Sequence, residues 1–457
     1  MKVAVIGAGI SGLTAAYRLQ QAGVEVVVLE RETVAGGKVR SSSENGLTFD
    51  WGANGFLNNA PDTLKLVEHL GLYSELESAA EVAKHRFIWR SNVLHKLPGT
   101  PPAAIATKLL TPLEKLRALF EYFIPAEEAR FESVFDFAAR RFGRAVAETF
   151  IAPMVIGITS GDARATSLDA LFPRMRAMEQ NKGSLLRAMI AAQRQAKKSG
   201  IKPPSARLTS FKHGGIQRLT DHLGERLGSS LKLGVSVSKL ERLNSGYRVF
   251  SSAGLLEVDA VILATPAFIS ADLLEDLNAA LALELRGIPY ADVRVFGLSF
   301  HASDVPANLD GFGFLVPRDQ GIRILGCLYT STLFPQQTRD NLVFLRVICG
   351  GSVDPSFSSL VPDAALEVVK HDLKLTLGIM AHPVSVHEAC WDKGIPQYML
   401  DHPERILKIE KLLEQTPGLY LAGNGYRGVG VNDCIREAEK TVKWILEQSR
   451  TQELVSV

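Results

Sequence analysis

The chain has 457 residues, of which 46% are hydrophobic and 22% are charged, and its formal net charge is +2. This length predicts about two or three domains with a large buried core, and the near-neutral charge argues against a nucleic-acid partner held by bulk electrostatics. No run of 18 apolar residues is present, which argues against a membrane-spanning helix. The first motif begins at residue 3, so no signal or transit peptide is expected. The four cysteines are widely spaced, which is typical of reduced core thiols and favours a cytoplasmic location.

A dinucleotide-binding pattern occupies the first 30 residues. Residues 3–6 are apolar and predict a short strand, and the glycine-rich run 7–12 follows at once. A helical stretch then extends to residue 21, and a second predicted strand over 24–29 ends on Glu30. This order of strand, glycine turn, helix, strand and acid is typical of a Rossmann-like half-unit.

Each part of this pattern has a physical task. Gly7 permits the tight turn, Gly9 lets the backbone approach a pyrophosphate, and Gly12 lets helix and strand pack closely. The start of the helix, at Ile10 and Ser11, offers unpaired N–H groups to the phosphates. Glu30 can accept hydrogen bonds from a ribose. A glycine-rich surface turn is the simpler alternative for an isolated motif of this kind.

A second glycine pair lies just after the ribose acid, in Arg31–Ser41. Gly37 and Lys38 belong to a Gly-Gly-Lys run, where a plain NAD domain usually has only a crossover. The arrangement resembles the FAD-binding GG motif of the flavin amine oxidase and porphyrinogen oxidase superfamily. A surface turn is again the simpler alternative.

The remaining elements alternate between helical and strand-rich stretches. Helix is predicted over 60–75, over most of 103–195 and over 432–448, and residues 196–205 are predicted to form a loop. Strands are predicted over 231–240, 246–264 and 419–424, and a mostly antiparallel sheet is predicted from 296–300, 312–316, 322–328 and 342–348.

This order predicts an α/β protein with a discontinuous Rossmann-like FAD-binding domain. That domain is expected to comprise residues 1–58, 206–270 and 390–457. An α+β substrate domain with an antiparallel sheet is expected from 59–80 and 271–389, and a mostly helical insertion that could bind a membrane from 81–205.

Over nearly its whole length the chain resembles the oxygen-dependent protoporphyrinogen oxidase family. The motifs that carry the resemblance are the N-terminal fingerprint, DWGANGF at 50–56, GITSGD at 157–162, FKHGG at 211–215, Trp391 followed by IPQY at 395–398, and GNGYRGVGVNDCI at 423–435. One departure is Ala53, where family members often have proline, which leaves that turn less rigid.

The resemblance implies FAD as the cofactor and no metal ion. The implied cofactor-binding residues are Gly7, Gly9, Ile10, Ser11, Gly12, Glu30, Arg31, Gly37, Lys38, Gly52, Ala53, Asn54, Gly55, Val237, Trp391, Val429, Gly430 and Val431. Val237 would pair its backbone with the adenine end, and Trp391 would lie near the ring system. Asn54 is implied to stand between flavin and substrate, in a catalytic position.

The resemblance also implies a substrate site. Arg86, before the aromatic Phe87, would bind a propionate carboxylate of the substrate, whereas an unassigned arginine is usually a surface residue. Phe312 and Leu315 would clamp a tetrapyrrole, with core packing as the alternative. Gly157 would give the macrocycle room, and Ile348 would line the pocket.

The implied activity is the oxidation of protoporphyrinogen IX to protoporphyrin IX by dioxygen, with release of hydrogen peroxide, at the penultimate step of haem or chlorophyll biosynthesis. No catalytic triad or spaced carboxylate pair is evident in the sequence, so we expect a hydride to pass from a methylene bridge to flavin N5. The nearest alternative is a coproporphyrinogen III oxidase that forms coproporphyrin III. Further alternatives are a flavin amine oxidase, a carotenoid desaturase-like enzyme and a flavin-binding regulator without turnover.

An amphipathic stretch bears on partners. Residues 110–123 have an apolar stripe beside Lys115 and Arg117. Such a stripe usually faces a core, but an apolar product makes peripheral contact with the cytoplasmic membrane face a competing hypothesis. The resemblance also allows a homodimer and hand-over of the product to ferrochelatase.

Overall fold

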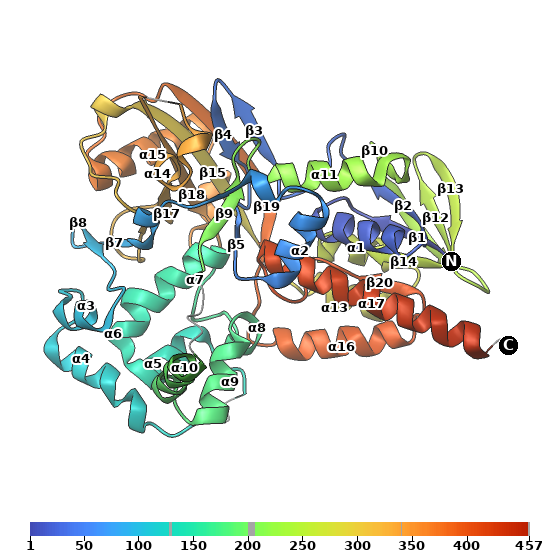
Figure 1. Ribbon diagram of the computed structural model, residues 1–457, viewed down its shortest axis with the longest axis horizontal. Helices are drawn as coiled ribbons and strands as arrows, with labels where there is room; N and C mark the ends of the chain where they lie inside the picture. Colours follow the sequence, from blue (N-terminus) through green and yellow to red (C-terminus); the bar gives the residue numbers. More distant parts are fainter. Residues whose placement is uncertain (128–129, 200–205, 340, 456–457) are drawn as a thin grey trace.

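The computed structural model describes residues 1–127, 130–199, 206–339 and 341–455. Figure 1 shows a parallel sheet flanked by helices near both termini, a second sheet beside α15 (Pro362–Leu377), and a separate group of helices. The mixed architecture confirms the predicted α/β class.

The nucleotide-binding sheet consists of five parallel strands in the order β10–β2–β1–β14–β20. Their bounds are β1 Lys2–Ile6, β2 Glu25–Glu30, β10 Leu231–Leu233, β14 Ala260–Leu263 and β20 Leu419–Leu421. β1 and β14 are buried on both faces, which explains their continuous apolar sequences. Because β1 pairs with β14, the sheet joins distant parts of the chain, as predicted.

Helices cover both faces of this sheet. One face packs against α1 (Ile10–Gln21), α11 (Gln217–Leu227) and α17 (Val431–Val455). The other packs against α12 (Ala267–Leu274), α13 (Ala279–Arg286) and α16 (His402–Glu414). Figure 1 shows α17 running alongside α1 and α2 (Pro61–His69) toward the C-terminus.

The strand predicted over 231–240 is divided in two. β10 ends at Leu233, and β11 (Val237–Arg242) begins a separate antiparallel sheet with β12 (Tyr247–Ser251) and β13 (Gly254–Val258). Gly234 has φ +69, a left-handed conformation that interrupts a strand. Period-2 alternation continued across this glycine, so the sequence pattern concealed the break.

The second sheet has seven strands in the order β19–β15–β18–β17–β16–β7–β8. Their bounds are β7 Phe87–Arg90, β8 Val93–Lys96, β15 Tyr290–His301, β16 Gly313–Leu315, β17 Gly326–Tyr329, β18 Leu342–Gly350 and β19 Ser385–Pro396. All neighbouring pairs are antiparallel except β16 and β7, so the predicted mostly antiparallel sheet is confirmed. α15 packs on this sheet around an aromatic and aliphatic core.

The predicted segment boundaries need several corrections. Residues 61–72 and 271–286 were expected in the substrate domain, but α2, α12 and α13 pack in the cores of the parallel sheet. Two further corrections concern the seven-stranded sheet. Residues 87–96 were expected in the helical part, but they form β7 and β8 at one edge of the sheet. The boundary expected at residue 390 falls inside β19, which pairs with β15 up to Pro396. In both places the strands are short or irregular in hydrophobic pattern, and pairing with distant strands decides their position.

The helical part contains most of residues 101–199. Its helices are α3 Pro101–Ala106, α4 Pro112–Leu119, α5 Val134–Phe142, α6 Arg144–Val146, α7 Ala152–Thr159, α8 Leu168–Leu171, α9 Pro173–Lys182 and α10 Leu185–Ser199, with a short 3₁₀ turn η3 at Phe120–Phe123. α10 extends over 196–199, which were predicted as loop; residues 200–205 lie outside the described residues. Among the helices that the structure describes, none has the length and apolar character of a membrane span.

Smaller elements join these parts. They are β3 Ser41–Glu44, β4 Leu47–Asp50, β5 Phe56–Leu57, β6 Leu76–Ser78, β9 Leu208–Phe211 and α14 Thr330–Leu333. β3 and β4 form a hairpin, and β5 and β6 both pair with β9. The chain between β4 and β5 therefore links the β3–β4 hairpin to the three-stranded sheet β5–β9–β6.

Candidate active site

The turn between β1 and α1 depends on its glycines. Gly7 has φ +101 and donates its N–H to Leu29 O at 2.9 Å. A Cβ on Gly12 would lie 2.0 Å from Gly7 O, so a glycine is needed where α1 packs on the turn. A Cβ on Gly9 would meet no atom within 4 Å. The turn therefore leaves open space over Gly9, where the sequence predicts a pyrophosphate.

The second glycine pair packs directly against this turn. Gly36 N donates to Ala8 O at 2.8 Å, and a Cβ on Gly37 would lie 3.3 Å from Gly9 Cα. Lys38 follows, with its Nζ 5.3 Å from the centroid of the Tyr290 ring. Burial lowers the pKa of Lys38 to about 8. A poorly solvated ammonium on the segment that packs against an open glycine turn is suited to an anionic ligand.

Glu30 lies at the end of β2, as predicted, and its carboxylate is anchored by backbone groups. It accepts from Ala8 N at 2.7 Å and from Glu32 N at 2.9 Å. A carboxylate has about four acceptor positions, so capacity remains for a ribose hydroxyl. Arg31 is exposed and pairs with Glu32 at 3.2 Å, so its predicted cofactor contact stays a prediction.

The predicted adenine contact lies at the edge of the same region. Val235 N donates to Glu30 O at 2.8 Å, which brings the start of β11 next to the end of β2. Val237 is half-buried and opens β11. The structure therefore places Val237 close to the ribose acid, although more than 200 residues separate them in sequence.

The loop 52–55 is bonded to the segment that carries Lys38. Ala53 N donates to Lys38 O at 3.1 Å, and a Cβ on Gly52 would lie 2.3 Å from the same oxygen. Gly55 has φ +150, and a Cβ there would lie 2.5 Å from Thr209 O. The loop is thus a closely fitted backbone segment, with the half-buried Asn54 between its two fixed glycines.

Trp391 contacts this loop region from the seven-stranded sheet. It lies on β19 and donates its Nε1–H to Trp51 O at 2.8 Å. Both tryptophans pack at the edge of a small core with Phe49 and Val295. The predicted position of Trp391 near the ring-binding end of the cofactor is consistent with this contact, and its direct role stays a prediction.

The first turn of α17 is fixed to the chain that follows the loop. Asn432 donates its Nδ2–H to Leu57 O at 2.9 Å and accepts from Thr63 Oγ1 at 2.7 Å. Val431, which begins α17, is buried in the core of the parallel sheet. The distant C-terminal motif is therefore brought beside residues 52–57.

Val429 and Gly430, which the resemblance implies as cofactor-binding residues, directly precede this helix. Gly430 N contacts Asp433 Oδ2 at 3.3 Å, and Val429 precedes it in a half-buried position. One turn on, Cys434 contacts Ser11 of α1, and burial raises the pKa of the Cys434 thiol to about 11. α17 and α1 thus start beside each other, which orients two helix N-termini toward one region.

Three of the predicted substrate residues come together. A Cβ on Gly157 of α7 would lie 2.9 Å from Leu315 Cδ2, and a Cβ on Gly326 would lie at the same distance from that atom. Ile348 on β18 stands opposite Gly326 on β17. Gly157, Leu315 and Ile348 therefore form one apolar group where α7 meets the seven-stranded sheet.

The other two predicted substrate residues form a pair at the next part of the sheet. The Arg86 guanidinium carbon lies 4.9 Å from the centroid of the Phe312 ring. Phe312 N donates to His85 O at 2.7 Å, which fixes the two segments together. Arg86 is exposed, so its guanidinium is available to an external carboxylate.

Comparisons with known proteins agree with this geometry. Residues 10–446 match the model of the flavin containing amine oxidoreductase family. The chain is 31% identical to protoporphyrinogen oxidase 2, chloroplastic/mitochondrial, of Arabidopsis thaliana, covering 97% of this chain and 94% of that protein. It is 29% identical to coproporphyrinogen III oxidase of Bacillus subtilis (strain 168), covering 96% and 97%.

The chain belongs to the flavin containing amine oxidoreductase family, in its porphyrinogen oxidase branch. Among solved structures, a protein from Exiguobacterium sp. 255-15 provisionally named a protoporphyrinogen oxidase superposes with a TM-score of 0.83 at 26% identity, covering 97% of this chain and 98% of that one. Reduced UDP-galactopyranose mutase shares the fold at 16% identity with a TM-score of 0.74.

The cofactor of this family member is FAD, and the described residues fit it. The open space over Gly9 admits a phosphate, and Lys38 supplies a buried positive charge on the segment that packs against this turn. Glu30 retains acceptor positions for a ribose hydroxyl. These groups follow one another in the order in which a diphosphate and an adenosine ribose would need them.

Sequence reasoning missed several residues that hold this flavoprotein site together. Arg346 donates to the carbonyls of Asp50 and Gly52, and Asn432 bonds α17 to Leu57. Arg346 could have been noticed as a lone charge inside the apolar strand LVFLRVIC. Asn432 belongs to the C-terminal motif, but no role was predicted for it from the sequence.

Proposed function

We propose that this protein oxidises protoporphyrinogen IX to protoporphyrin IX with FAD and dioxygen, at the penultimate step of haem biosynthesis. The observation that carries the proposal is the nearly full-length similarity to protoporphyrinogen oxidases. The apolar group of Gly157, Leu315 and Ile348 supports it, because a tetrapyrrole needs an apolar wall with a cation at its margin.

In this proposal the chain contributes binding and orientation. When bound, FAD takes up two electrons from the porphyrinogen in each of three rounds and passes them to dioxygen, which yields hydrogen peroxide. Gly157 and Leu315 position the macrocycle, and Arg86 holds a propionate. Asn54 lies on the loop between the two ligands.

Coproporphyrinogen III is the second candidate substrate. Curated relatives with that name match at 29% identity in Bacillus subtilis (strain 168) and 27% in Staphylococcus aureus (strain NCTC 8325 / PS 47). We propose protoporphyrinogen as the preferred substrate because Arg86 supplies one propionate contact. The test measures the rise of porphyrin fluorescence in air when the FAD-loaded protein is mixed with each porphyrinogen. A faster rise with coproporphyrinogen would make coproporphyrinogen III the preferred substrate, and no rise with either would reject both candidates.

Lys38 is expected to make FAD binding depend on pH. Burial lowers its pKa from the ordinary value of 10.5 to about 8, and a diphosphate would restore the charged form. FAD binding therefore takes up a proton above pH 8, so the affinity should fall by about tenfold between pH 7 and pH 9. Titration of the apo-protein by FAD fluorescence measures this change. Lys38→Met should bind FAD more weakly and lose most of the pH dependence; an unchanged slope would contradict the assignment.

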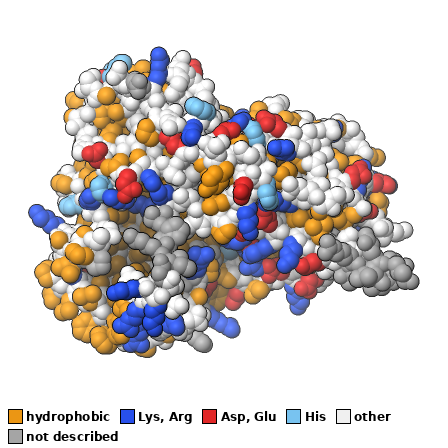
Figure 2. All heavy atoms as spheres, in the orientation of Figure 1, with side chains coloured by type: hydrophobic (Ala, Val, Ile, Leu, Met, Phe, Trp, Pro, Cys, Tyr) orange, Lys and Arg blue, Asp and Glu red, His pale blue; other side chains and the backbone are white. Residues whose placement is uncertain are grey.

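We propose that the helical part makes peripheral contact with the cytoplasmic face of a membrane. Figure 2 shows hydrophobic side chains gathered over the end of the molecule that carries α3 and α4, with basic side chains beside them. Leu113 and Phe123 are 78% and 71% exposed. The exposed apolar residues of this patch are Ile105, Leu113, Leu116, Leu119, Phe120, Tyr122 and Phe123. A patch of this kind on a monomer favours an interface or a membrane surface.

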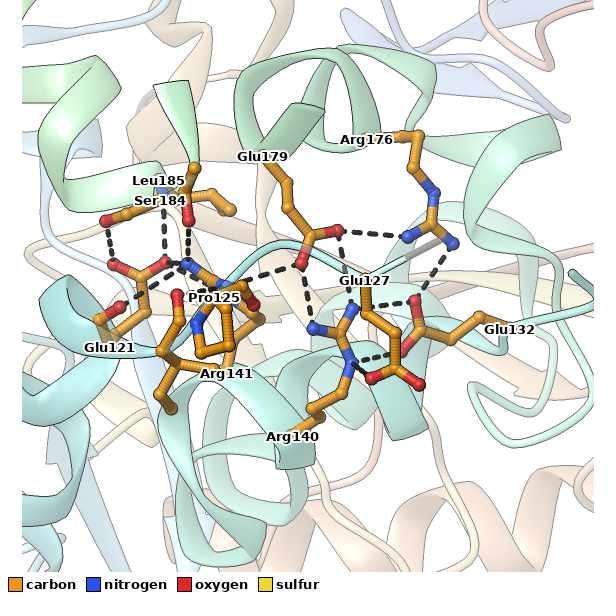
Figure 3. Close-up of polar contacts among 12 residues, drawn as sticks. Glu121, Pro125, Glu127, Glu132, Arg140, Arg141, Arg176, Glu179, Ser184 and Leu185 are labelled. Atoms are coloured by element: carbon orange, nitrogen blue, oxygen red, sulfur yellow. Dashed lines mark hydrogen bonds and ion pairs between the residues drawn. The ribbon is translucent and has the colours of Figure 1, made fainter. Parts of the chain in front are cut away.

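A buried polar network keeps these apolar side chains outside. Glu121, in the middle of the patch, is fully buried and pairs with Arg141 of α5. Its carboxylate also accepts from Ser184 Oγ at 2.6 Å and from Leu185 N at 2.8 Å. Figure 3 shows this network continuing through Glu179. Because Glu121 is directed inward, its neighbours Phe120 and Tyr122 are directed toward solvent.

Phe123→Asp is expected to weaken binding to vesicles that contain anionic lipids by about tenfold, because one large apolar side chain contributes about 1.5–3 kcal/mol when it leaves water. Cosedimentation measures the bound fraction. Val361→Asp, at an exposed apolar residue on another part of the surface, should leave binding unchanged. Equal binding by the wild type and Phe123→Asp would contradict the membrane proposal. Hand-over to ferrochelatase and a homodimer stay predictions.

A further inference from the structure

The backbone of residues 50–52, which we call the strap, is fastened from two sides. Arg346 Nε donates to Asp50 O at 3.1 Å, and Arg346 Nη2 donates to Gly52 O. Trp391 Nε1 donates to Trp51 O between them. Every carbonyl of the strap therefore accepts from a side chain of the seven-stranded sheet.

The opposite side of the strap is bonded to the cofactor-binding segment. Trp51 N donates to Arg40 O at 2.9 Å, and the next bond joins Ala53 N to Lys38 O at 3.1 Å. The strap continues directly into Asn54. Its position thus depends on both the segment that carries Lys38 and the sheet that carries Ile348.

Arg346 occupies an unusual position for a charged side chain. It lies in the middle of β18, is 5% exposed, and is flanked by the fully buried Leu345 and Val347. Burial lowers the pKa of Arg346 to about 10, and the Asp50 carboxylate opposes this shift, so the guanidinium stays charged near neutral pH. Within the described residues no carboxylate lies within ion-pair distance of it. Its hydrogen-bond partners are instead the strap carbonyls.

The Asp50 carboxylate is engaged elsewhere. Its Oδ1 accepts from Ser41 Oγ at 2.6 Å and from Ile216 N at 3.2 Å. A Cβ on Gly215 would lie 2.4 Å from that oxygen. Asp50 therefore fixes the strap to β3 and to residues 215–216, whereas Arg346 fixes it to the substrate side. A buried guanidinium whose hydrogen-bond partners are carbonyls, with no carboxylate of the described residues within ion-pair distance, is unfavourable for folding, which favours a functional reason for its retention.

We propose that Arg346 is a positioning residue, which rests on the function proposed above: it holds the strap against the seven-stranded sheet and so sets the distance between the Asn54 loop at the flavin and the apolar group that binds the porphyrinogen. Ile348 is two residues from Arg346 on β18 and points to the same face of the strand. One rigid strand thereby supports both the substrate wall and the flavin loop.

Arg294 offers a matched control for a purely structural effect. It lies on the neighbouring strand β15, its side chain is mostly buried, and it also donates to backbone carbonyls, with Ser358 O at 2.9 Å. Its carbonyl partners belong to a surface turn and not to the strap. Arg294 also pairs with Glu388 at 3.3 Å, so Arg294→Gln removes at least as many polar contacts from the same sheet without touching residues 50–54.

The experiment compares Arg346→Gln, Arg346→Lys and Arg294→Gln as FAD-loaded proteins. We expect Arg346→Gln to retain stoichiometric FAD, because the β1–α1 turn is intact, but to change the visible circular dichroism of the bound flavin. The rate of flavin reduction at saturating porphyrinogen should fall by about tenfold or more with little change in KM, because misplacement of reacting groups affects the reaction step. Arg346→Lys, which keeps the charge but has no forked geometry, should be intermediate.

A wild-type spectrum and rate in Arg346→Gln would overturn the proposal, as would an equal change in Arg294→Gln. If Arg346→Gln does not fold, Arg346→Lys decides: a changed flavin spectrum supports the proposal and an unchanged one overturns it. The dichroism needs only bound FAD. It therefore tests the role of Arg346 even if the wild-type protein oxidises neither porphyrinogen. A lack of oxidation by the wild type would reject the proposed function but would not reject the role of Arg346.

Discussion

Gly9→Asp is expected to abolish FAD binding without lowering the stability of the apo-protein. Gly9 has φ −73, which any residue can adopt, and a Cβ there meets nothing within 4 Å. It is also the N-cap of α1, a position at which aspartate is favoured over glycine by a few tenths of a kcal/mol. The new carboxylate would occupy the space over the turn and repel the pyrophosphate. FAD content after purification and thermal unfolding of the apo-protein measure the two effects.

Two companion variants make this result specific. Gly9→Asn has nearly the same size without the charge, so it should bind FAD weakly and show how much of the loss is electrostatic. Gly12→Ala should instead destabilise the apo-protein by about 1–3 kcal/mol, because its Cβ would lie 2.0 Å from Gly7 O. Stoichiometric FAD in purified Gly9→Asp would contradict the placement of the diphosphate at this turn.

Arg86→Met is expected to raise KM for the porphyrinogen by between about tenfold and a hundredfold. A charge-assisted hydrogen bond to a carboxylate contributes about 1.5–3 kcal/mol, and methionine keeps part of the packing on Phe312 while it removes the charge. Since Arg86 is remote from the reacting bridge in this proposal, kcat should change little. Steady-state kinetics with FAD-saturated enzyme measure both constants.

Lys84→Met is the matched control for general electrostatics near Arg86. Lys84 is exposed and pairs with Glu81 at 3.1 Å, so its loss should leave KM within about a factor of two. A similar rise in KM in both variants would indicate that overall charge attracts the substrate. An unchanged KM in Arg86→Met would remove Arg86 from the substrate site.

The sequence predicted the geometry of the turn between β1 and α1 well because its signals are local. A glycine turn between strand and helix, followed by an acid, specifies short-range backbone geometry, and Gly7, Gly12 and Glu30 lie where that pattern predicts. The C-terminal motif carried no such geometry by itself. Its place beside the loop 52–55 follows from Asn432, which reaches Leu57 across the fold.

Other structural features could not be predicted from the sequence pattern. The alternation over 231–240 continues across Gly234, so only the observed left-handed turn separates β10 from β11. β7 and β8 are too short to specify their sheet, and they are placed by pairing with β16. The apolar stripe of residues 110–123 was expected to face a core in the usual case, with a membrane surface as the competing hypothesis. Glu121, buried against Arg141, decides that its apolar side chains face solvent.

The sequence alone determined the α/β class, the family resemblance and the glycine turn between β1 and α1, because these depend on residues that are neighbours in the chain. Tertiary structure decided how that turn is joined to the substrate side. Arg346 contacts Asp50 and Gly52 across almost 300 positions of sequence, and Gly157 meets Leu315 across two different parts of the fold. Such contacts arise when distant strands pair and bury their side chains, and no local pattern specifies which strands those are.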